Sequence, residues 1–385
     1  MGLFARKRKD AAADGTEQTE VGKAKNKKPA ATAFKQQRLK AWQPILTPRT
    51  VLPTLFIMGL IFAPIGGVLI WGSNKITEFT LDYTECDTQS STLTDMPSSK
   101  FSYSLASGHS STSISNPQWS YTNSTTGNVW ERQVCTLEFD VPYDLDPSVF
   151  LYYKLTNYYQ NHRRYVQSVD TDQLHGSAQS ASTLNSGNCK PITSIGGLPV
   201  YPCGLIANSV FNDTFNTPTL ISTSQVYNFT SNGITWSNEH KKYLDAGYKN
   251  VSQVAVPPNW VERYGSTYTE FPKLYDDPHF MVWMRTAGLP TFRKLFFRNV
   301  EETMAQGRYR IEIYMNYPVK QFNGTKSMVI STVSWIGGKN SFLGWAYVAA
   351  AALFALLGLL GTVRHLMKPR RLGDMSLLSW NQPKK

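Results

Sequence analysis

Four cysteines carry the most direct chemistry in this chain, and their spacing favours disulfide bonds over a metal site. They follow one another at intervals of 49, 54 and 14 positions, whereas a zinc site needs tighter spacing or histidine partners. The six histidines are scattered and include no pair at the spacing of metal ligands. In an oxidising compartment, an even number of cysteines predicts two disulfides, for which three pairings are possible. We favour the sequential one, Cys86 with Cys135 and Cys189 with Cys203, because it closes loops of moderate length.

The sequence contains none of the short motifs that mark common enzyme classes. The patterns G-x-S-x-G, H-E-x-x-H, G-x-x-x-x-G-K-S/T and G-x-G-x-x-G are absent. Asp276 and Asp277 are adjacent, so on a strand they would point apart, and they favour a solvated turn over a catalytic dyad. We therefore expect no catalytic residue, no cofactor and no metal ligand. An ectoenzyme remains an alternative, since folding can bring serine, histidine and aspartate together.

N-linked glycosylation is a second kind of chemistry that the sequence predicts. Five Asn-x-Ser/Thr sequons occur, and all of them lie between two long apolar stretches. A single sequon says little, but five in one segment agree with a glycosylated domain outside the cytosol. The acceptor residues are Asn123, Asn212, Asn228, Asn250 and Asn323.

The two apolar stretches predict membrane-spanning helices. Residues 51–71 and residues 342–363 contain 21 and 22 residues without a charge. At 1.5 Å per residue each would be about 31–33 Å long, which is enough to cross a hydrocarbon core of about 30 Å. The first stretch starts 50 residues into the chain and is not followed by an Ala-x-Ala-like site. It therefore predicts a signal anchor and not a cleavable signal peptide.

The net charge of +12 resides in the two tails. Residues 1–50 carry a net charge of +8 and residues 364–385 a net charge of +5, whereas residues 51–363 carry −1. Because the part long enough to fold is balanced, a nucleic-acid-binding protein is disfavoured. Lysines and arginines beside the ends of the apolar stretches place both tails in the cytosol.

These features divide the chain into six segments. We expect a disordered basic cytosolic tail (1–33), a juxtamembrane cytosolic segment (34–50), a first transmembrane helix (51–71), a lumenal or extracellular glycosylated ectodomain (72–341), a second transmembrane helix (342–363) and a cytosolic C-terminal tail (364–385).

Neither predicted span contains an ionisable residue, which argues against a stand-alone transporter. The second span has small residues four positions apart, namely Ala346 with Ala350 and Ala351 with Ala355. Such pairs allow another helix to approach closely, although alanine is also simply common in membrane helices. Pro64 in the first span predicts a kink. Both features are consistent with a partner inside the membrane.

The segment before the first span, residues 33–46, has the composition of an amphipathic stretch. Phe34, Trp42 and other apolar residues recur at helical spacing, with basic residues beside them. We expect this segment to lie at the cytosolic membrane interface, where its basic side chains meet anionic lipid.

Between the spans, alternating apolar and polar residues predict an all-β class, an antiparallel β-sandwich with long loops and short helices. The alternation favours strands over residues 78–83, 136–141 and 308–317, and more buried strands over residues 150–155 and 328–333. Residues 278–294 could hold short helical turns. The stretches 84–115 and 170–188 are rich in serine, threonine, glycine and asparagine, and we expect them to be mobile surface loops.

Several segments resemble one protein family closely. They read FKQQRLKAWQPILTPRTVLP (34–53), NHRRYVQS (161–168), YPCGLIANSVFNDTF (201–215), WMRTAGLP (283–290), GTKS (324–327) and IGGKNSFLG (336–344). Together with two spans, the sequons and four cysteines, they are similar to the cell division control protein 50 / ligand-effect modulator family, fungal type. The resemblance covers about residues 34–380, but not the first 30 residues or the two polar stretches.

The resemblance implies a non-catalytic accessory (beta) subunit of a type IV P-type ATPase, a phospholipid flippase. Such a subunit has a β-sandwich over the lumenal loops of a ten-helix pump, which it helps to leave the endoplasmic reticulum and to complete its transport cycle. Catalysis would then reside in the ATPase, and the destination would be the Golgi, endosomes or plasma membrane. The fungal-type pattern has two disulfides, in agreement with the sequential pairing.

We expect contacts with the ATPase, and with membrane lipids, at three places. These are the cytosolic juxtamembrane segment, the small-residue face of the second span, and parts of the ectodomain. The predicted contact residues are Gln36, Gln37, Arg38, Trp42, Arg49, Arg163, Arg164, Asn208, Phe211, Arg285, Ala346, Ala350, Ala351 and Ala355. For Arg163 and Arg164 the alternative is pairing with carboxylates of their own domain, and for the segment 208–215 it is a structural brace. The alternative function is a stand-alone cell-surface receptor or adhesion glycoprotein.

Overall fold

The structure, a computed structural model, describes residues 32–39, 46–109, 113–126 and 128–369, together with Met375 and Leu378. The chain forms two compact units, one of residues 1–53 with 361–385 and the other of residues 54–360. The predicted basic tail 1–33 lies almost entirely outside the described residues, as do Trp42 and most of the C-terminal tail.

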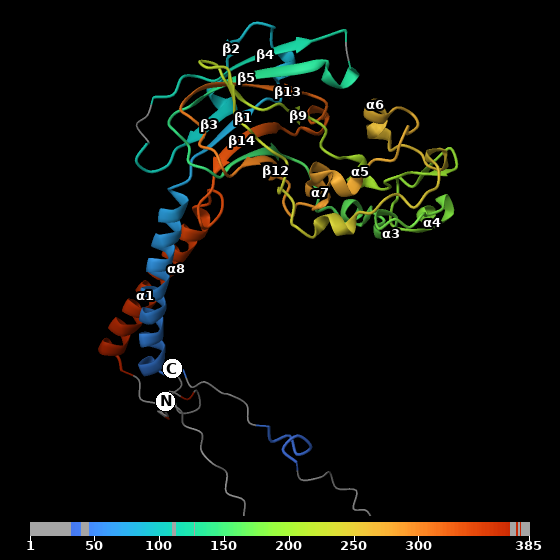
Figure 1. Cartoon of the computed structure of the whole chain (residues 1–385). Helices are drawn as coiled ribbons and strands as arrows, with labels where there is room; N and C mark the ends of the chain where they lie inside the picture. The colour runs from blue at the N-terminus through green and yellow to red at the C-terminus, as the bar shows by residue number, and fades with distance from the viewer. Residues whose placement is uncertain are drawn as a thin grey trace, which may run out of the picture. The chain divides into compact units, whose positions relative to one another are not determined.

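Two long helices match the predicted spans and extend a few residues beyond them. Helix α1 (Pro48–Ser73) and helix α8 (Phe342–Met367) are each long and apolar enough to cross a membrane (Figure 1). Most of each helix is exposed on the chain's own surface, as expected for residues that face lipid. Helix α1 continues without a break past Pro64, so the predicted kink does not interrupt it.

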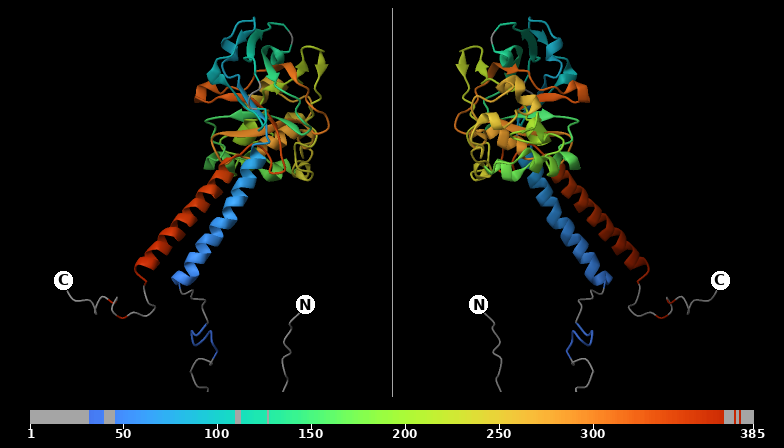
Figure 2. Two further views of the ribbon diagram at one scale, coloured as in Figure 1. Left: turned by 90° about the vertical axis from the view of Figure 1, so that its left-hand side faces the viewer. Right: turned by 90° about the vertical axis from the view of Figure 1, so that its right-hand side faces the viewer.

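The two helices run side by side along a line of small residues (Figure 2). A Cβ atom added at Gly66 of α1 would lie 2.9 Å from the carbonyl oxygen of Gly344 in α8. A Cβ atom at Gly59 would lie 3.3 Å from the carbonyl oxygen of Ala351. Backbone therefore packs on backbone at these points, which only small residues allow.

Residues 74–341, the sandwich domain, contain two antiparallel sheets, as predicted. The first sheet has the order β12 (Phe292–Asn299), β6 (Val149–Leu155), β14 (Lys326–Thr332), β1 (Glu78–Asp82) and β3 (Phe101–Ser104). The second has the order β11 (Gln225–Val226), β10 (Thr219–Leu220), β13 (Gly307–Tyr314), β5 (Gln133–Val141), β4 (Gln118–Asn123) and β2 (Thr94–Asp95), with β9 (Thr214–Phe215) also beside β13. A hairpin of β7 (Ser194–Ile195) and β8 (Leu198–Pro199) stands apart.

Strands β1 and β14 join the sandwich to the two long helices. Strand β1 follows α1 within a few residues, and β14 comes shortly before α8. The two strands are antiparallel neighbours, with Glu78 opposite Ser331 and Asp82 opposite Ser327. At the end nearest the helices, the backbone N–H of Thr332 donates to the carbonyl of Thr77 at 2.9 Å.

The predicted alternation places the core between the sheets. Strand β6 alternates between buried and half-buried residues along its whole length, and Leu137, Phe139 and Leu151 are fully buried. The predicted strands are confirmed as β1, β5, β6, β13 and β14. One is shorter than expected, because β13 ends at Tyr314 and the backbone N–H groups of Asn316 and Tyr317 donate to the Asp213 carboxylate instead of to a strand.

Short helices gather beside the sheets (Figure 1), and we call them with their connections the helical layer. They are α2 (Arg163–Gln167), α3 (Thr171–Leu174), α4 (Ala181–Ser186), α5 (Leu205–Asn208), α6 (Val261–Tyr264) and α7 (Pro278–Met284). The 3₁₀ helices are η1 (Cys86–Thr88), η2 (Ser98–Lys100), η3 (Val129–Glu131), η4 (Glu239–Lys242), η5 (Val251–Gln253), η6 (Pro258–Trp260), η7 (Leu274–Asp276) and η8 (Lys320–Phe322). The layer has its own core, which includes Tyr201, Trp260 and Phe280.

Both stretches expected to be mobile loops contain regular structure, so that expectation was wrong. The stretch 170–188 contains α3 and α4, because Asp170 and Ser180 cap these helices and Leu174 and Leu184 are buried. The stretch 84–115 supplies β2 and β3 and the buried residue Met96. Isolated apolar residues anchor both segments, although their overall composition is polar.

Candidate partner-binding surfaces and the residues that build them

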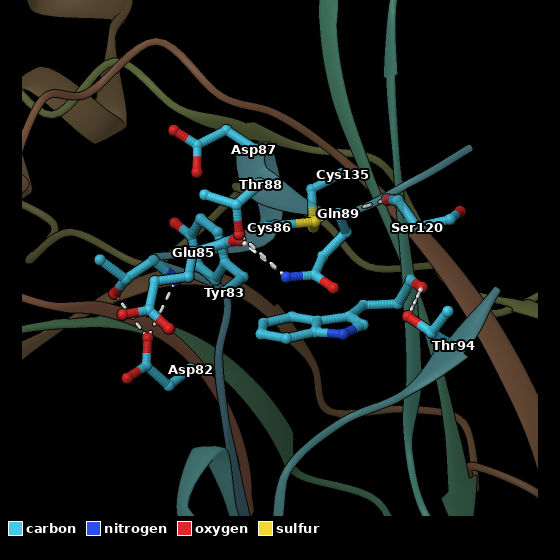
Figure 3. Close-up of a disulfide and its surroundings, with 12 residues drawn as sticks. Asp82, Tyr83, Glu85, Cys86, Asp87, Thr88, Gln89, Thr94, Ser120 and Cys135 are labelled. Atoms are coloured by element: carbon cyan, nitrogen blue, oxygen red, sulfur yellow. Dashed lines mark hydrogen bonds between the residues drawn. A yellow bond between two sulfur atoms is a disulfide. The ribbon is translucent and has the colours of Figure 1, made fainter. Parts of the chain in front are cut away.

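Two disulfides fix the framework, with the sequential pairing. Cys86 of η1 is bonded to Cys135 of β5, with their Cα atoms 5.9 Å apart (Figure 3). Cys189 is bonded to Cys203, with their Cα atoms 5.7 Å apart, within the helical layer. All four residues are buried. Among the described residues, no group of histidine, cysteine, aspartate or glutamate side chains is arranged to hold a metal ion.

We expect the variant Cys203→Ser to lose stability. A disulfide that closes about 15 residues contributes about 3 kcal/mol in the chain-entropy account, and the helical layer depends on this bond to hold the segment before α5. The expected result is a lower unfolding temperature, with retention in the endoplasmic reticulum when the variant is expressed in cells. The double variant Cys189→Ser/Cys203→Ser controls for a reactive free thiol. An unchanged unfolding temperature with normal surface delivery would contradict the prediction.

A buried ion pair joins two of the six segments that resemble the family. Lys326 lies in GTKS and Asp213 in YPCGLIANSVFNDTF, and their charged atoms are 2.7 Å apart with side chains 4% and 0% exposed. The same carboxylate accepts hydrogen bonds from the Tyr83 hydroxyl at 2.9 Å and from two backbone N–H groups at 2.6 Å. Lys326 also donates to the carbonyl of Tyr317. Burial, followed by the charge of Asp213, raises the pKa of Tyr83 well above its usual value.

A second buried lysine, Lys294, caps the C-terminal end of α7, which overlaps the start of the segment WMRTAGLP. The Lys294 ammonium donates to the carbonyls of Val282, Trp283 and Arg285, where α7 ends. A cation at this position satisfies carbonyls that have no partner inside the helix. Burial, and then the nearby charge of Arg285, lowers the pKa of Lys294 to about 7.

The segments NHRRYVQS and YPCGLIANSVFNDTF meet each other directly. The hydroxyl of Ser168 accepts from the backbone N–H of Leu205 at 2.8 Å and donates to the carbonyl of Lys190. Gly204 fits against this turn, since a Cβ atom there would lie 2.1 Å from the carbonyl oxygen of Ser168. Its φ of +96° also favours glycine.

Four of the five predicted ectodomain contact residues fall into two groups. Arg163 and Arg164 are exposed on α2. Among the described residues, neither arginine forms an ion pair with a carboxylate, so the structure does not support the alternative that they pair within their own domain. Asn208 and Phe211 are buried instead. Asn208 accepts from the backbone N–H of Asn259, and the ring of Phe211 stacks on Tyr153 at 3.9 Å. Both side chains pack within the domain, which agrees with the alternative that the segment 208–215 is a structural brace.

Arg285 lies at the edge of a cavity on the same side as α2. Its guanidinium is 2.5 Å from a carboxylate oxygen of Glu239 and 4.4 Å over the ring of Trp236. The cavity has a volume of ≈ 350 Å³ and is lined by Val166 of α2 and Met284 as well as by Arg285. Val166 is 41% exposed, so an apolar hollow with basic residues near it faces outward.

The predicted cytosolic contact residues are exposed where the structure describes them. Gln36, Gln37 and Arg38 lie in or beside a turn, and Arg49 is exposed in the first turn of α1. The expected amphipathic segment 33–46 is a turn over its described part, and residues 40–45 lie outside the described residues.

The small residues of α8 divide between two faces. Ala351 is buried against α1, so its small size is needed within this chain. Ala355 is exposed, but its backbone N would lie 3.7 Å from a Cβ atom added at Gly59 of α1, so it belongs to the same face as Ala351. Ala346 is exposed and Ala350 is half-buried, so these two remain candidates for contact with another helix. Sequence spacing alone did not separate the two faces, because Gly344 and Gly358 were needed to recognise the internal one.

Four of the five sequon asparagines are exposed, and the fifth lines a cleft. Asn123, Asn228, Asn250 and Asn323 are exposed. Asn212 is half-buried, and its Oδ1 is buried with no hydrogen-bond partner in the described part of the chain.

The cleft that Asn212 lines has a volume of ≈ 650 Å³. It lies between the helical layer and the turns that follow β6 and β13. Its aromatic lining residues are Tyr158, Tyr159, Tyr165, Tyr317 and Phe322, and its carboxamide lining residues are Asn157, Asn208, Asn212, Asn259, Asn316 and Gln321. The lining contains Glu262 but neither lysine nor arginine.

The reasoning from sequence missed the buried lysines. A signal was present for Lys326, which comes directly before the segment expected to be a more buried strand. A charge at such a position needs a partner, but no spacing rule identifies Asp213 as that partner. For Lys294 we find no comparable signal.

Comparisons with known proteins find one family that is similar to this chain over most of its length. The family model described as the LEM3 (ligand-effect modulator 3) family / CDC50 family matches residues 69–371. The phospholipid-transporting ATPase accessory subunit CRF1 of Saccharomyces cerevisiae is 40% identical over 92% of this chain and 90% of its own length. The phospholipid-transporting ATPase accessory subunit CDC50 of Chaetomium thermophilum is 35% identical over 99% and 98%. Cell cycle control protein 50A of Bos taurus is 40% identical over 88% and 89%.

Proposed function

This chain belongs to the LEM3/CDC50 family, and from that premise we propose that it is the accessory subunit of a phospholipid-transporting P-type ATPase. The observation that carries the proposal is similarity over almost the whole length to proteins named as accessory subunits of such ATPases. The two membrane-length helices and the disulfide-bonded sandwich fit a subunit that assembles with a membrane pump.

We further propose that the chain is non-catalytic and that ATP hydrolysis and lipid movement occur in its partner. The names of the relatives support this, since they describe accessory subunits. The apolar stretches contain no aspartate, glutamate, histidine, lysine or arginine between residues 51 and 71 or between 342 and 363, where a substrate pathway would need a charged group.

The proposed topology has both tails in the cytosol and the sandwich domain in the lumen or outside the cell. The basic excess in the tails supports this orientation, and so does the position of all five sequons between the helices. We propose a route from the endoplasmic reticulum to the Golgi, endosomes or plasma membrane.

Three surfaces are proposed to contact the ATPase. The first is the cytosolic segment with Gln36 to Arg38 and Arg49, and the second is the outward face of α8 around Ala346 and Ala350. The third is α2 with the neighbouring cavity at Arg285. An apolar hollow beside unpaired arginines suits a lumenal loop with an apolar side chain and nearby carboxylates, because arginines at interface centres often dominate binding.

The third surface gives a prediction. The variant Arg163→Ala/Arg164→Ala should reduce recovery of the ATPase with this chain by about tenfold, since two exposed arginines without internal partners would be lost from the interface. The matched control is Lys241→Ala/Lys273→Ala, which removes two exposed lysines of the same layer. Equal recovery of the ATPase with both variants, measured by quantitative mass spectrometry, would remove α2 from the proposed interface.

Purification from mild detergent tests the function as a whole. We expect a ten-helix P-type ATPase to co-purify in a one-to-one ratio, and cells lacking this chain to take up less fluorescent phospholipid. A chain that is stable alone at the cell surface, with unchanged lipid uptake in its absence, would support the alternative of a stand-alone receptor or adhesion glycoprotein.

A further inference from the structure

We propose that the cleft of ≈ 650 Å³ is a saccharide-binding site, and that it holds the core of the N-linked glycan carried by Asn212 of this same chain. The inference goes beyond the role of the chain as an accessory subunit. Of the proposed function it uses only the lumenal placement of the sandwich domain, where Asn212 can be glycosylated.

The chemistry of the cleft fits a neutral sugar. Each carboxamide side chain in its wall offers both donors and an acceptor, as neighbouring hydroxyl groups require. The rings of Tyr159 and Phe322 are 56% exposed and offer flat apolar faces on which a pyranose ring can pack. Without lysine or arginine in the lining, the cleft lacks the donors that hold a phosphate or a carboxylate. Its volume lies within the usual range of small-ligand sites.

Several polar groups in the cleft have no partner within the protein. Among the described residues, the side chains of Asn259, Glu262 and Gln321 form no hydrogen bond or ion pair. Other amides of the wall are already engaged, for example Asn157 with the carbonyl of Phe322. The unengaged side chains are therefore free to bind the hydroxyl groups of a ligand.

Asn212 is the sequon residue that the geometry selects. Its side chain is part of the wall, whereas the other four sequon asparagines do not line the cleft. Asn323 follows Phe322 but is exposed in a turn and does not line the cleft. A sugar attached to Asn212 would start inside the cleft, so even weak contacts would hold it there, since the covalent link makes its effective concentration high.

The residues of the Asn212 sequon become inaccessible to an enzyme when the protein folds. Asp213 is fully buried in its pair with Lys326, and Thr214 belongs to β9, which pairs with Tyr314 of β13. An enzyme that must reach these residues has to act before folding. The glycan is then present when the cleft forms, and its core contacts residues from both the sandwich and the helical layer.

Site-resolved deglycosylation tests the proposal on the full-length chain, purified in detergent from a glycosylating host together with any bound ATPase. The probe is peptide N-glycosidase F under native conditions in ¹⁸O-water, with mass spectrometry of each sequon. We expect the Asn212 glycan to be released about tenfold more slowly than the glycan at exposed Asn250, because cleavage requires local opening. After denaturation both rates should become equal.

A cleft variant separates this site from general shielding. Tyr159→Ala/Gln321→Ala removes one ring and one amide of the wall, and both side chains are exposed, so folding should be preserved. It should accelerate release at Asn212 and leave Asn250 unchanged. The control Val261→Ala alters an exposed residue outside the lining and should change neither rate.

Three outcomes would overturn the inference. They are equal native release at Asn212 and Asn250, slow release at Asn212 that the cleft variant does not accelerate, and glycans at Asn250 but none at Asn212. Absence of glycan from all five sequons would contradict the lumenal placement itself, so failure of the inference and failure of the proposed topology remain distinguishable.

Discussion

Replacing Lys326 with methionine is expected to lower the free energy of unfolding of the sandwich domain by about 3–5 kcal/mol, because the Asp213 carboxylate would stay buried without its counter-charge. For a domain of this size, that loss corresponds to roughly 10 °C in the unfolding temperature. Methionine has a similar length and is apolar, so the variant isolates the charge and leaves little empty space. The measurement is thermal unfolding of the purified full-length chain, followed by intrinsic fluorescence.

The chain provides a matched control for this prediction in its surface ion pairs. Lys320 pairs with Asp87, but the two side chains are 44% and 36% exposed, and exposed pairs contribute about 0–1 kcal/mol. Lys320→Met should therefore change the unfolding temperature little. In the double variant Asp213→Asn/Lys326→Met, both buried charges are gone, and at least half of the lost stability should return. If Lys326→Met lowered the unfolding temperature no more than Lys320→Met does, the buried pair of Asp213 and Lys326 would not contribute the stability that its geometry indicates.

The second large effect is expected at Gly204, where alanine should cost about 2–5 kcal/mol. Two causes act together. The added Cβ atom would lie 2.1 Å from the carbonyl oxygen of Ser168, so the backbone would have to shift. The backbone of Gly204 also has a φ of +96° and a ψ of 167°, a region that residues with a Cβ atom adopt only with strain. Chemical denaturation of the full-length chain would measure the change in the unfolding midpoint.

Gly265 separates the two causes. It has a similar backbone conformation, with φ of 78° and ψ of −179°, but an added Cβ atom would have no neighbour nearer than 3.7 Å. Gly265→Ala therefore measures the conformational cost alone, about 1–3 kcal/mol. A larger loss in Gly204→Ala than in Gly265→Ala is expected, and equal losses would show that the contact with Ser168 relaxes at no cost.

Where one physical cause acts locally, the sequence predicted the fold well. Alternation along β1, β5 and β13 reflects a strand with one buried face, and that pattern depends only on neighbouring residues. The two spans follow from length and lack of charge. The sequential pairing of the cysteines needed only an estimate of loop length.

Where long-range contacts decide the structure, prediction from sequence was poorer. The stretch 278–294, expected to hold short helical turns, does contain α7, but strand β12 begins within it and was not predicted; its alternation is interrupted at a bulge between Leu295 and Phe297. Short strands such as β9 exist only because β13 lies beside them. Phe211 was predicted to bind a partner, whereas it stacks on Tyr153, a residue far away in the sequence. Arg163 is exposed, but its role in contact with a partner stays a prediction.

The pairing of β1 with β14 gives the molecule a mechanical property. Both long helices pull on the same end of this ladder, the end at Glu78 and Ser331. A force that separates the helices would therefore break the hydrogen bonds between β1 and β14 one after another, beginning with the bond between Thr332 and Thr77. A force that tilts both helices together would load no single bond first. The contact of α1 with α8 through Gly66 and Gly344 holds the two helices together and thus opposes a force that would separate them at this end of the ladder.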